Sequence, residues 1–96
     1  MNFNEFQNSL QFPEPPALAE ELLVLWYDGK GDWNTAHLIA QEIKSRAGSH
    51  LHAYLHRKEG DSFNAKYWYV QAGETMPDYS LEKEWEILVE RYLKNE

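Results

Sequence analysis

The sequence predicts an all-α protein of about five helices, and three features of the chain lead to that fold class. Apolar residues recur at helical spacing, for example at Leu18, Leu22 and Leu25, so that they share one side of a helix. No segment alternates between apolar and polar residues with the period of two expected of a strand. Gly-Asp pairs begin at Gly31 and Gly60, where glycine permits a tight reversal and aspartate can cap the helix that follows. We therefore expect antiparallel helix-turn-helix hairpins.

Residues 1–16 are expected to form an N-terminal arm followed by a Pro-rich link. Phe3, Phe6 and Leu10 have near-helical spacing, which favours a short helix or an ordered arm laid on the core. The prolines between residues 13 and 16 then forbid a helix and give a stiff, extended link.

The central part of the chain is expected to hold two hairpins. Helices are predicted from Ala17 to about Tyr27, from Asp32 to about Ile43, from about His50 to Lys58, and from Phe63 to Ala72. Gly48 and Ser49 are expected to break the chain between the second and the third of these helices. Apolar residues surround the fourth helix instead of forming a stripe, which is typical of a helix packed on several sides.

The last helix is expected to follow Ser80, a residue type that favours the N-cap position. Leu81, Trp85 and Leu88 lie on its apolar face, and glutamates, Glu84 among them, lie on the opposite face as solvated surface. The whole chain is expected to be a single domain. Its parts are the arm and link (1–16), a first helical unit (17–45), a second unit (46–79) and a capping helix (80–96).

Composition and charge exclude several classes of protein. The chain has 96 residues, a net charge of −7 and no cysteine, and 15% of its residues are aromatic. Aromatic side chains can supply the core of a small domain, and without cysteine there is no disulfide framework or thiolate metal site. The negative charge and the scattered basic residues disfavour nucleic acid and anionic membranes as partners. Because the sequence has no apolar run of membrane-spanning length and no signal peptide, we expect a cytoplasmic location.

The two Gly-Asp pairs head two related stretches that begin 29 residues apart. At positions +5, +9 and +12 the first stretch has alanine, alanine and isoleucine, and the second has alanine, tyrosine and alanine. Small residues let neighbouring helices approach closely, and a larger residue at +9 fills the space between them. In this spacing the chain resembles the tetratricopeptide repeat family over about 60 residues, and the second unit is the better match. The residues that carry the resemblance are Ala53, Gly60, Ala65, Tyr69, Ala72 and Pro77.

The resemblance implies a function in binding a protein or peptide. In that family the first helix of each unit lines a concave groove for a peptide or a partner's helix. The corresponding positions here are Leu18, Glu21, Leu25, Asp28, Ala47, His50, Tyr54, Arg57 and Lys58. A tyrosine beside two cations suits an acidic peptide or a C-terminal carboxylate. The alternative is that the N-terminal arm or the last helix fills a groove built from only two units.

His52 and His56 lie four residues apart, which places both imidazoles on one face of a helix, as in helical metal sites. The residues that could add ligands are His37, His50, Glu42 and Glu59. The resemblance implies a structural role instead, because both histidines take positions where the family packs a leucine and a tyrosine between two helices. The structural interpretation is the favoured one, and neither a metal nor a cofactor is expected.

A pocket for a metal or ligand, with or without enzymatic activity, is the alternative function. Its residues would be His37, His52, His56, Tyr67 and Trp68. Imidazoles that share an open cavity with a third donor would favour this alternative, and imidazoles wedged singly among aromatic side chains would favour an interaction module. Tyr67 and Trp68, if uncovered, would form an apolar patch for a partner or a homodimer. Because the chain has no catalytic motif, we expect a non-enzymatic protein- or peptide-binding module.

Overall fold

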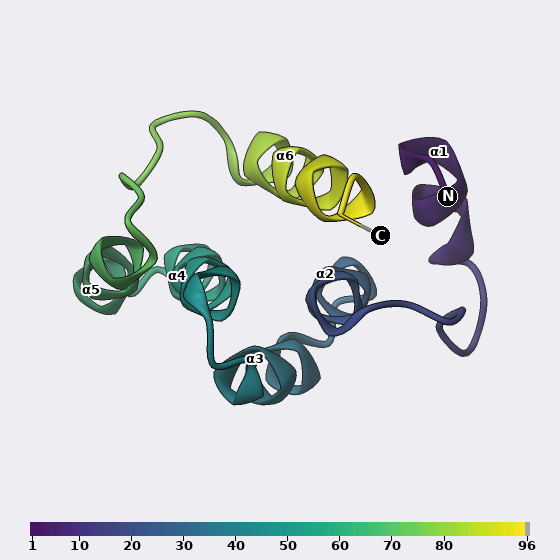
Figure 1. Cartoon of the computed structure of the whole chain (residues 1–96), viewed down its shortest axis with the longest axis horizontal. Coiled ribbons are helices and arrows are strands. Elements are labelled where there is room, and N and C mark those ends of the chain that lie inside the picture. Colours follow the sequence, from purple (N-terminus) through teal and green to yellow (C-terminus); the bar gives the residue numbers. More distant parts are fainter. Residues whose placement is uncertain (96) are drawn as a thin grey trace.

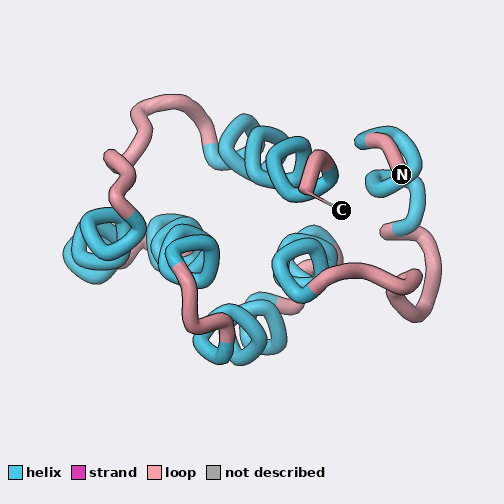
Figure 2. The backbone as a smooth tube through the Cα atoms, in the orientation of Figure 1, coloured by secondary structure: helices cyan, strands magenta, loops and turns pink. Residues whose placement is uncertain are grey.

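The structure is a computed structural model that describes residues 1–95, and all regular structure among them is helical (Figure 2). The helices are α1 (Phe3–Ser9), α2 (Glu20–Gly29), α3 (Trp33–Glu42), α4 (Arg46–Lys58), α5 (Ser62–Ala72) and α6 (Leu81–Leu93). The predicted all-α class is confirmed. The helices number six and not about five, because the N-terminal arm forms a helix of its own, with Asn2 and Glu5 in a capping box. None of the helices in this described part is both long enough and apolar enough to cross a membrane.

Helices α2 to α5 follow one another along an arc, and α6 lies across the inner side of that arc (Figure 1). Within the arc, α2 packs against α3, α3 against α4, and α4 against α5. The loop after α5 carries the chain back over the arc, so that α6 packs on α2 and on the N-terminal helix α1.

Both Gly-Asp pairs form the hinge of a hairpin, as predicted. Gly31 and Gly60 have φ angles of 85° and 87°, in the left-handed region that glycine adopts without strain. The side chains of Asp32 and Asp61 each accept a hydrogen bond from a backbone N–H in the first turn of the following helix. The reversals are short, so α2 lies beside α3 and α4 lies beside α5.

Helix α4 begins earlier than predicted, at Arg46, and the expected break at Gly48 and Ser49 is wrong. Ser45 provides the N-cap, because its side chain accepts a hydrogen bond from the backbone N–H of Gly48. Gly48 serves close packing and not a turn: a Cβ atom at this position would lie 2.0 Å from the carbonyl oxygen of Ile43. The glycine therefore lets the connection from α3 pass tightly over the first turn of α4.

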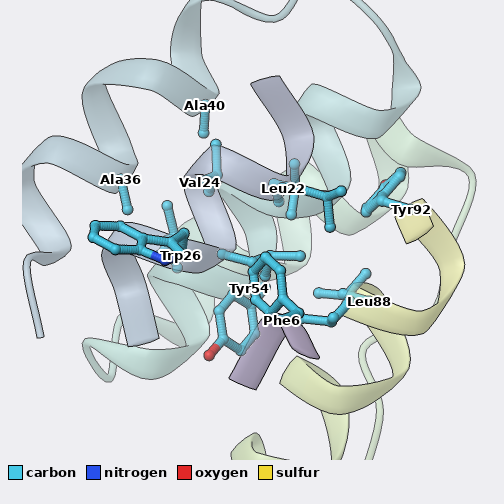
Figure 3. Packing of buried hydrophobic residues seen from close by; sticks show 13 residues of the cluster. Phe6, Leu22, Val24, Trp26, Ala36, Ala40, Tyr54, Leu88 and Tyr92 are labelled. Atoms are coloured by element: carbon cyan, nitrogen blue, oxygen red, sulfur yellow. The ribbon is translucent and has the colours of Figure 1, made fainter. Parts of the chain in front are cut away.

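The larger of two apolar clusters lies between α1, α6 and the arc (Figure 3), and a smaller one, made of Ala53, Ala65 and Tyr69, lies between α4 and α5. Trp26 and Tyr54 are among the largest buried side chains of the larger cluster, and leucines from α2, α4 and α6 surround them. The indole N–H of Trp26 donates a hydrogen bond to the hydroxyl of Ser9 at 3.1 Å, and Phe6 is fully buried. The N-terminal arm is therefore part of the core.

Helix α5 lies at one end of the arc and is packed on one side only. Its buried residues are Ala65, Tyr69 and Ala72, and its exposed apolar residues are Phe63, Tyr67 and Val70. The prediction that α5 is packed on several sides is therefore wrong. The loop after Gly73 leads the chain to the inner side of the arc, so no further helix of residues 1–95 covers the outer face of α5.

Candidate metal centre

Three histidines from two helices meet where α3 packs against α4. His37 lies on α3, and His52 and His56 lie on successive turns of α4. The Nε2 atoms of His37 and His52 are 2.9 Å apart, so one ring donates a hydrogen bond to the other. One nitrogen from each of the three rings lies within 4.8 Å of the other two. We call His37, His52 and His56 the histidine cluster. The cluster therefore contains His52 and His56, the pair identified in the sequence, and His37, one of the two histidines predicted as possible further ligands.

The histidine cluster lies at the boundary between core and solvent. His52 is buried, with 9% of its surface exposed, whereas His37 and His56 are half-buried. The rings of His52 and His56 stack with their centroids 4.7 Å apart, and the ring of His37 meets both of them edge-on. The three imidazoles are thus in mutual contact, and two of them are accessible from outside.

Two tryptophans orient the rings of the histidine cluster. Trp33 stacks on His37 with ring centroids 4.8 Å apart, and Trp68 stacks on His52 at 4.2 Å. Trp33 is itself fixed, because its indole N–H donates a hydrogen bond to the carbonyl oxygen of Leu55 at 2.9 Å. Trp68 belongs to the predicted pocket, whereas Trp33 is not among the predicted residues. The sequence nevertheless indicates that Trp33 lies near His37, since it precedes His37 by four residues and therefore lies on the same face of the helix.

Glu59 supports His56 from outside the cluster. Its Oε1 atom lies 2.6 Å from Nδ1 of His56, so the Nδ1–H group donates a hydrogen bond to the carboxylate. That tautomer leaves the lone pair of Nε2 free for a metal ion, and a carboxylate behind a ligating histidine also raises its basicity. Asp61 forms a second group with His56 and Glu59, and Glu42 belongs to neither group. Of the two predicted carboxylates, Glu59 is therefore the one at the cluster.

Burial keeps His37 and His52 in the neutral form. Desolvation, followed by the charges of His37 and His56, lowers the pKa of His52 to about 4. Desolvation is also the main reason why the pKa of His37 lies below its ordinary value. Both rings are therefore neutral at pH 7, and neutral imidazole is the form that binds a transition metal.

The metal-free protein is expected to lose stability as the pH falls from about 6.5 to about 4. In the unfolded chain His52 takes up a proton near its ordinary pKa of about 6.5. In the folded protein burial delays that step, because the pKa of His52 is about 4. The unfolded state binds more protons between these values, so acid lowers the free energy of unfolding, for this residue by on the order of 2 kcal/mol.

Urea unfolding of wild type and His52→Gln at several pH values across this window measures the effect. Glutamine keeps a polar side chain of similar reach but does not titrate, so the variant should lose less stability with falling pH. Equal losses in the two proteins would show that His52 is not the group responsible.

His50 and Tyr67, two further predicted site residues, lie away from the cluster. Nδ1 of His50 is 3.1 Å from a guanidinium nitrogen of Arg91, and its Nε2 is 3.9 Å from the carboxylate of Glu84. His50 therefore faces α6 and not α3, and burial lowers its pKa. Tyr67 is 53% exposed, and its ring meets that of Trp68 with the centroids 5.1 Å apart.

The predicted peptide groove lies under α6. The groove residues that are buried are Leu25, Asp28, His50 and Tyr54. Those that keep some exposure are Leu18, Glu21, Ala47, Arg57 and Lys58. Trp85 of α6 crosses this surface and donates a hydrogen bond to the carbonyl oxygen of Leu25 at 3.0 Å. The last helix therefore covers much of the predicted groove, and a pocket of about 540 Å³ stays open between Asp28, Tyr54 and Lys58 on one side and α6 on the other.

Asp28, Tyr54 and Lys58, all predicted to line the groove, bind one another. The Tyr54 hydroxyl and the Lys58 ammonium donate hydrogen bonds to the two carboxylate oxygens of Asp28 at 2.6 and 2.8 Å. Burial, then the charge of Asp28, raises the pKa of Tyr54 and keeps its hydroxyl protonated as a donor. This cluster joins α2 to α4.

Glu84 is a buried carboxylate, and its predicted place on the solvated face of α6 is wrong. Its side chain accepts hydrogen bonds from the Arg57 guanidinium at 2.8 Å and from the Tyr69 hydroxyl at 2.5 Å. Arg57 also donates to the backbone carbonyl of Tyr79 in the loop before α6. The Arg57 charge compensates the carboxylate, which is why Glu84 can be buried where helix periodicity predicts an exposed residue.

Comparisons with known proteins assign no family to this fold and site. No family model matches the chain, and no curated protein or solved structure shows a significant match to it. The fold and the site themselves define a small all-α protein with a three-histidine cluster, backed by a glutamate, between two packed helices.

Proposed function

We propose that this protein binds a divalent transition metal, zinc being the best suited, through His37, His52 and His56. The observation that carries the proposal is the convergence of three ring nitrogens within 4.8 Å of one another. Imidazole nitrogens suit zinc, nickel and copper, and three protein ligands are the set found in zinc sites that keep a further position open. The imidazoles touch one another and are not wedged singly among aromatic side chains, which supports this function over an interaction module.

The spacing of the nitrogens is close to what a zinc ion requires. Tetrahedral zinc with Zn–N bonds of about 2.0–2.1 Å separates two ligand nitrogens by roughly 3.3 Å. The Nε2 atoms of His37 and His52 are 2.9 Å apart, so an ion would replace their hydrogen bond after a small outward movement of the rings. His56 is stacked on His52, and one of its ring nitrogens lies within 4.8 Å of a nitrogen of each of the other two rings, so it is the third ligand. Trp33 and Trp68 stack on the rings of His37 and His52 and restrict their rotamers, so these two side chains lose little freedom when a metal binds.

Zinc is expected to bind with a stoichiometry of one ion per chain and to raise the melting temperature. At free zinc about 100 times the dissociation constant, the free energy of unfolding should increase by about 2.7 kcal/mol. For a domain of this size, that corresponds to an increase in Tm of about 10–20 °C. Isothermal titration calorimetry gives the stoichiometry, and thermal unfolding followed by circular dichroism gives the shift.

The matched control uses another histidine of α4. His37→Ala and His56→Gln should lose most of the zinc response, and His50→Gln should keep it, because His50 faces α6. Calorimetry at a temperature where each variant is folded separates lost binding from lost stability. The proposal fails if wild type does not bind zinc, or if His37→Ala binds it as tightly as wild type does.

Partner binding at the predicted groove is not proposed, because α6 covers much of that surface. Leu25 and Tyr54 are buried in the core beneath it, and Arg57 is paired with Glu84 of α6. A peptide would have to displace α6 and break this buried ion pair to reach the residues beneath that helix, and the part of the groove that stays open is a pocket of about 540 Å³ at Asp28, Tyr54 and Lys58.

A further inference from the structure

The pocket of about 540 Å³ that stays open beside α6 lies between α1, α2, α4 and α6. Its apolar walls are formed by Phe3, Leu10, Leu81 and Trp85. A pocket of this volume, with apolar and aromatic walls and a few charged groups, is typical of sites for small molecules. His37, His52 and His56 lie outside its lining, so a ligand in this pocket is independent of the metal.

The aromatic wall of this pocket is held in place by contacts within the fold. The indole N–H of Trp85 is bound to the carbonyl oxygen of Leu25 at 3.0 Å, and the ring of Phe3 meets the indole edge-on with the centroids 5.8 Å apart. A Cβ atom at Gly29 would lie 3.0 Å from Leu10 and 3.2 Å from Trp85, so both side chains close over the glycine backbone. The wall is therefore formed before a ligand arrives, and little side-chain freedom is lost on binding.

The charges around the pocket favour a positively charged ligand. Among residues 1–95, the charged side chains of the lining are three carboxylates and one ammonium: Asp28, Glu82, Glu86 and Lys58. The Lys58 ammonium is bound to Asp28 at 2.8 Å, so these two charges compensate each other. Glu82 and Glu86 lie one turn apart on α6 and remain accessible to solvent. Lys83 is 3.8 Å from Glu86, in an exposed pair of the kind that contributes little.

We infer that this pocket binds a small organic cation, an ammonium that carries an aromatic group, with Glu82 and Glu86 as its ion-pair partners. The aromatic group lies against the wall made by Phe3 and Trp85, where its burial supplies the apolar part of the affinity. A ligand with a carboxylate is disfavoured, because the two glutamates repel it and the one cation of the lining, Lys58, is already paired.

This inference reverses the sign of the ligand expected at these residues from the sequence. Tyr54 and Lys58 suit a carboxylate, but that carboxylate is supplied by Asp28 of the chain itself, at 2.6 and 2.8 Å. The charges left for a ligand are those of α6, and they are negative.

Two-dimensional NMR spectra of the isotope-labelled protein test the inference with probes of similar size and different charge. The probes are phenethylammonium, phenethyl alcohol and phenylacetate. Phenethylammonium should move the signals of the Trp85 indole N–H and the Gly29 amide, because both residues line the pocket. It should bind about three- to tenfold more tightly than the alcohol, since its ion pairs are partly exposed, and phenylacetate should bind most weakly.

Glutamine at both acidic positions separates charge from shape. Glu82→Gln combined with Glu86→Gln should weaken phenethylammonium about three- to tenfold and leave the alcohol unchanged. Glu20→Gln combined with Glu90→Gln is the matched control, because it removes two charges at exposed positions outside the lining. This control should bind phenethylammonium as tightly as wild type does.

Several outcomes would overturn the inference. Equal affinities of wild type for phenethylammonium and the alcohol would show that the glutamates do not select a cation. Full retention of phenethylammonium binding by the variant with glutamine at 82 and 86 would show the same. Absence of shifts at Trp85 and Gly29 would place the ligand elsewhere or show that it does not bind. Tightest binding of phenylacetate would mean that Lys58 sets the preference. None of these outcomes bears on zinc binding, which is measured separately.

Discussion

Replacing Glu84 with alanine is expected to lower the free energy of unfolding by about 3–5 kcal/mol. The side chain is 1% exposed and accepts hydrogen bonds from Arg57 and Tyr69. Its removal leaves the Arg57 charge without its partner and a buried tyrosine hydroxyl without an acceptor, and both penalties fall on the folded state. Small domains have only about 5–15 kcal/mol of stability, so this loss is a large part of the total. Equilibrium unfolding in urea measures it.

Glu82→Ala is the matched control, because Glu82 lies on the same helix and is exposed. It should change stability by no more than about 0.5 kcal/mol. The free energy of unfolding of Glu84→Gln should lie between those of the two alanine variants, since the amide oxygen of glutamine still accepts a hydrogen bond but carries no charge. Zinc affinity should be unaffected in Glu84→Gln, because Arg57 faces α6 and the histidine cluster faces α3. If Glu82→Ala and Glu84→Ala lowered the free energy of unfolding equally, the contacts of Glu84 would contribute nothing, and α6 would be held in place by its apolar face alone.

Replacing Gly48 with alanine is expected to destabilise the protein by on the order of 3 kcal/mol, although the same change usually stabilises a helix interior. The new Cβ atom would lie 2.0 Å from the carbonyl oxygen of Ile43 and 2.9 Å from the carbonyl carbon. Those atoms belong to the backbone, so no side-chain rotation relieves the contact. The first turn of α4 or the connection from α3 must move. Thermal unfolding of the two proteins compares their stabilities.

Gly60→Ala is the comparison that separates this steric clash from the backbone strain of placing a non-glycine residue at a positive φ angle. No atom lies within 4 Å of the Cβ position at Gly60, but its φ angle is 87°. Alanine there should cost only about 1–2 kcal/mol of backbone strain. Asparagine, which tolerates the left-handed region better, should recover part of that loss. A Gly48→Ala variant as stable as wild type would contradict the close approach of Ile43 to α4.

Local chemistry explains why the hairpins could be predicted from the sequence. A glycine followed by an aspartate sets a left-handed residue and then a helix cap, and both effects involve only neighbours in the chain. Gly31-Asp32 and Gly60-Asp61 therefore appear in the structure where the sequence placed them. Gly48 misled the prediction because its role depends on Ile43, whose carbonyl approaches α4 through the packing of the connection. The resemblance to the tetratricopeptide repeat family stays a prediction.

The candidate site could be predicted only in part, because only its local features depend on neighbours in the chain. The spacing of His52 and His56 places them on one face of a helix whatever surrounds it. The sequence named His37 and His50 as possible third ligands and placed only His37 in the alternative pocket. The packing of α3 against α4 brings the ring of His37 to His52, whereas His50 faces α6. The sequence could not tell whether His52 and His56 have a structural role or bind a ligand. The residues next to them in the chain are the same whether each imidazole packs alone or lies in a cluster of three.

By itself, the sequence determined the all-α class, the two hinges, the helix caps and the pairing of His52 with His56 on one face. These features depend on interactions within one or two turns of the chain. The tertiary structure decided that α6 covers much of the predicted groove, that Glu84 is buried against Arg57, and that His37 joins His52 and His56 in the histidine cluster. Each of these contacts joins residues that are 15 or more positions apart. Helix periodicity assigns a residue to a face of its own helix, but the partner of that face is fixed only when the helices pack.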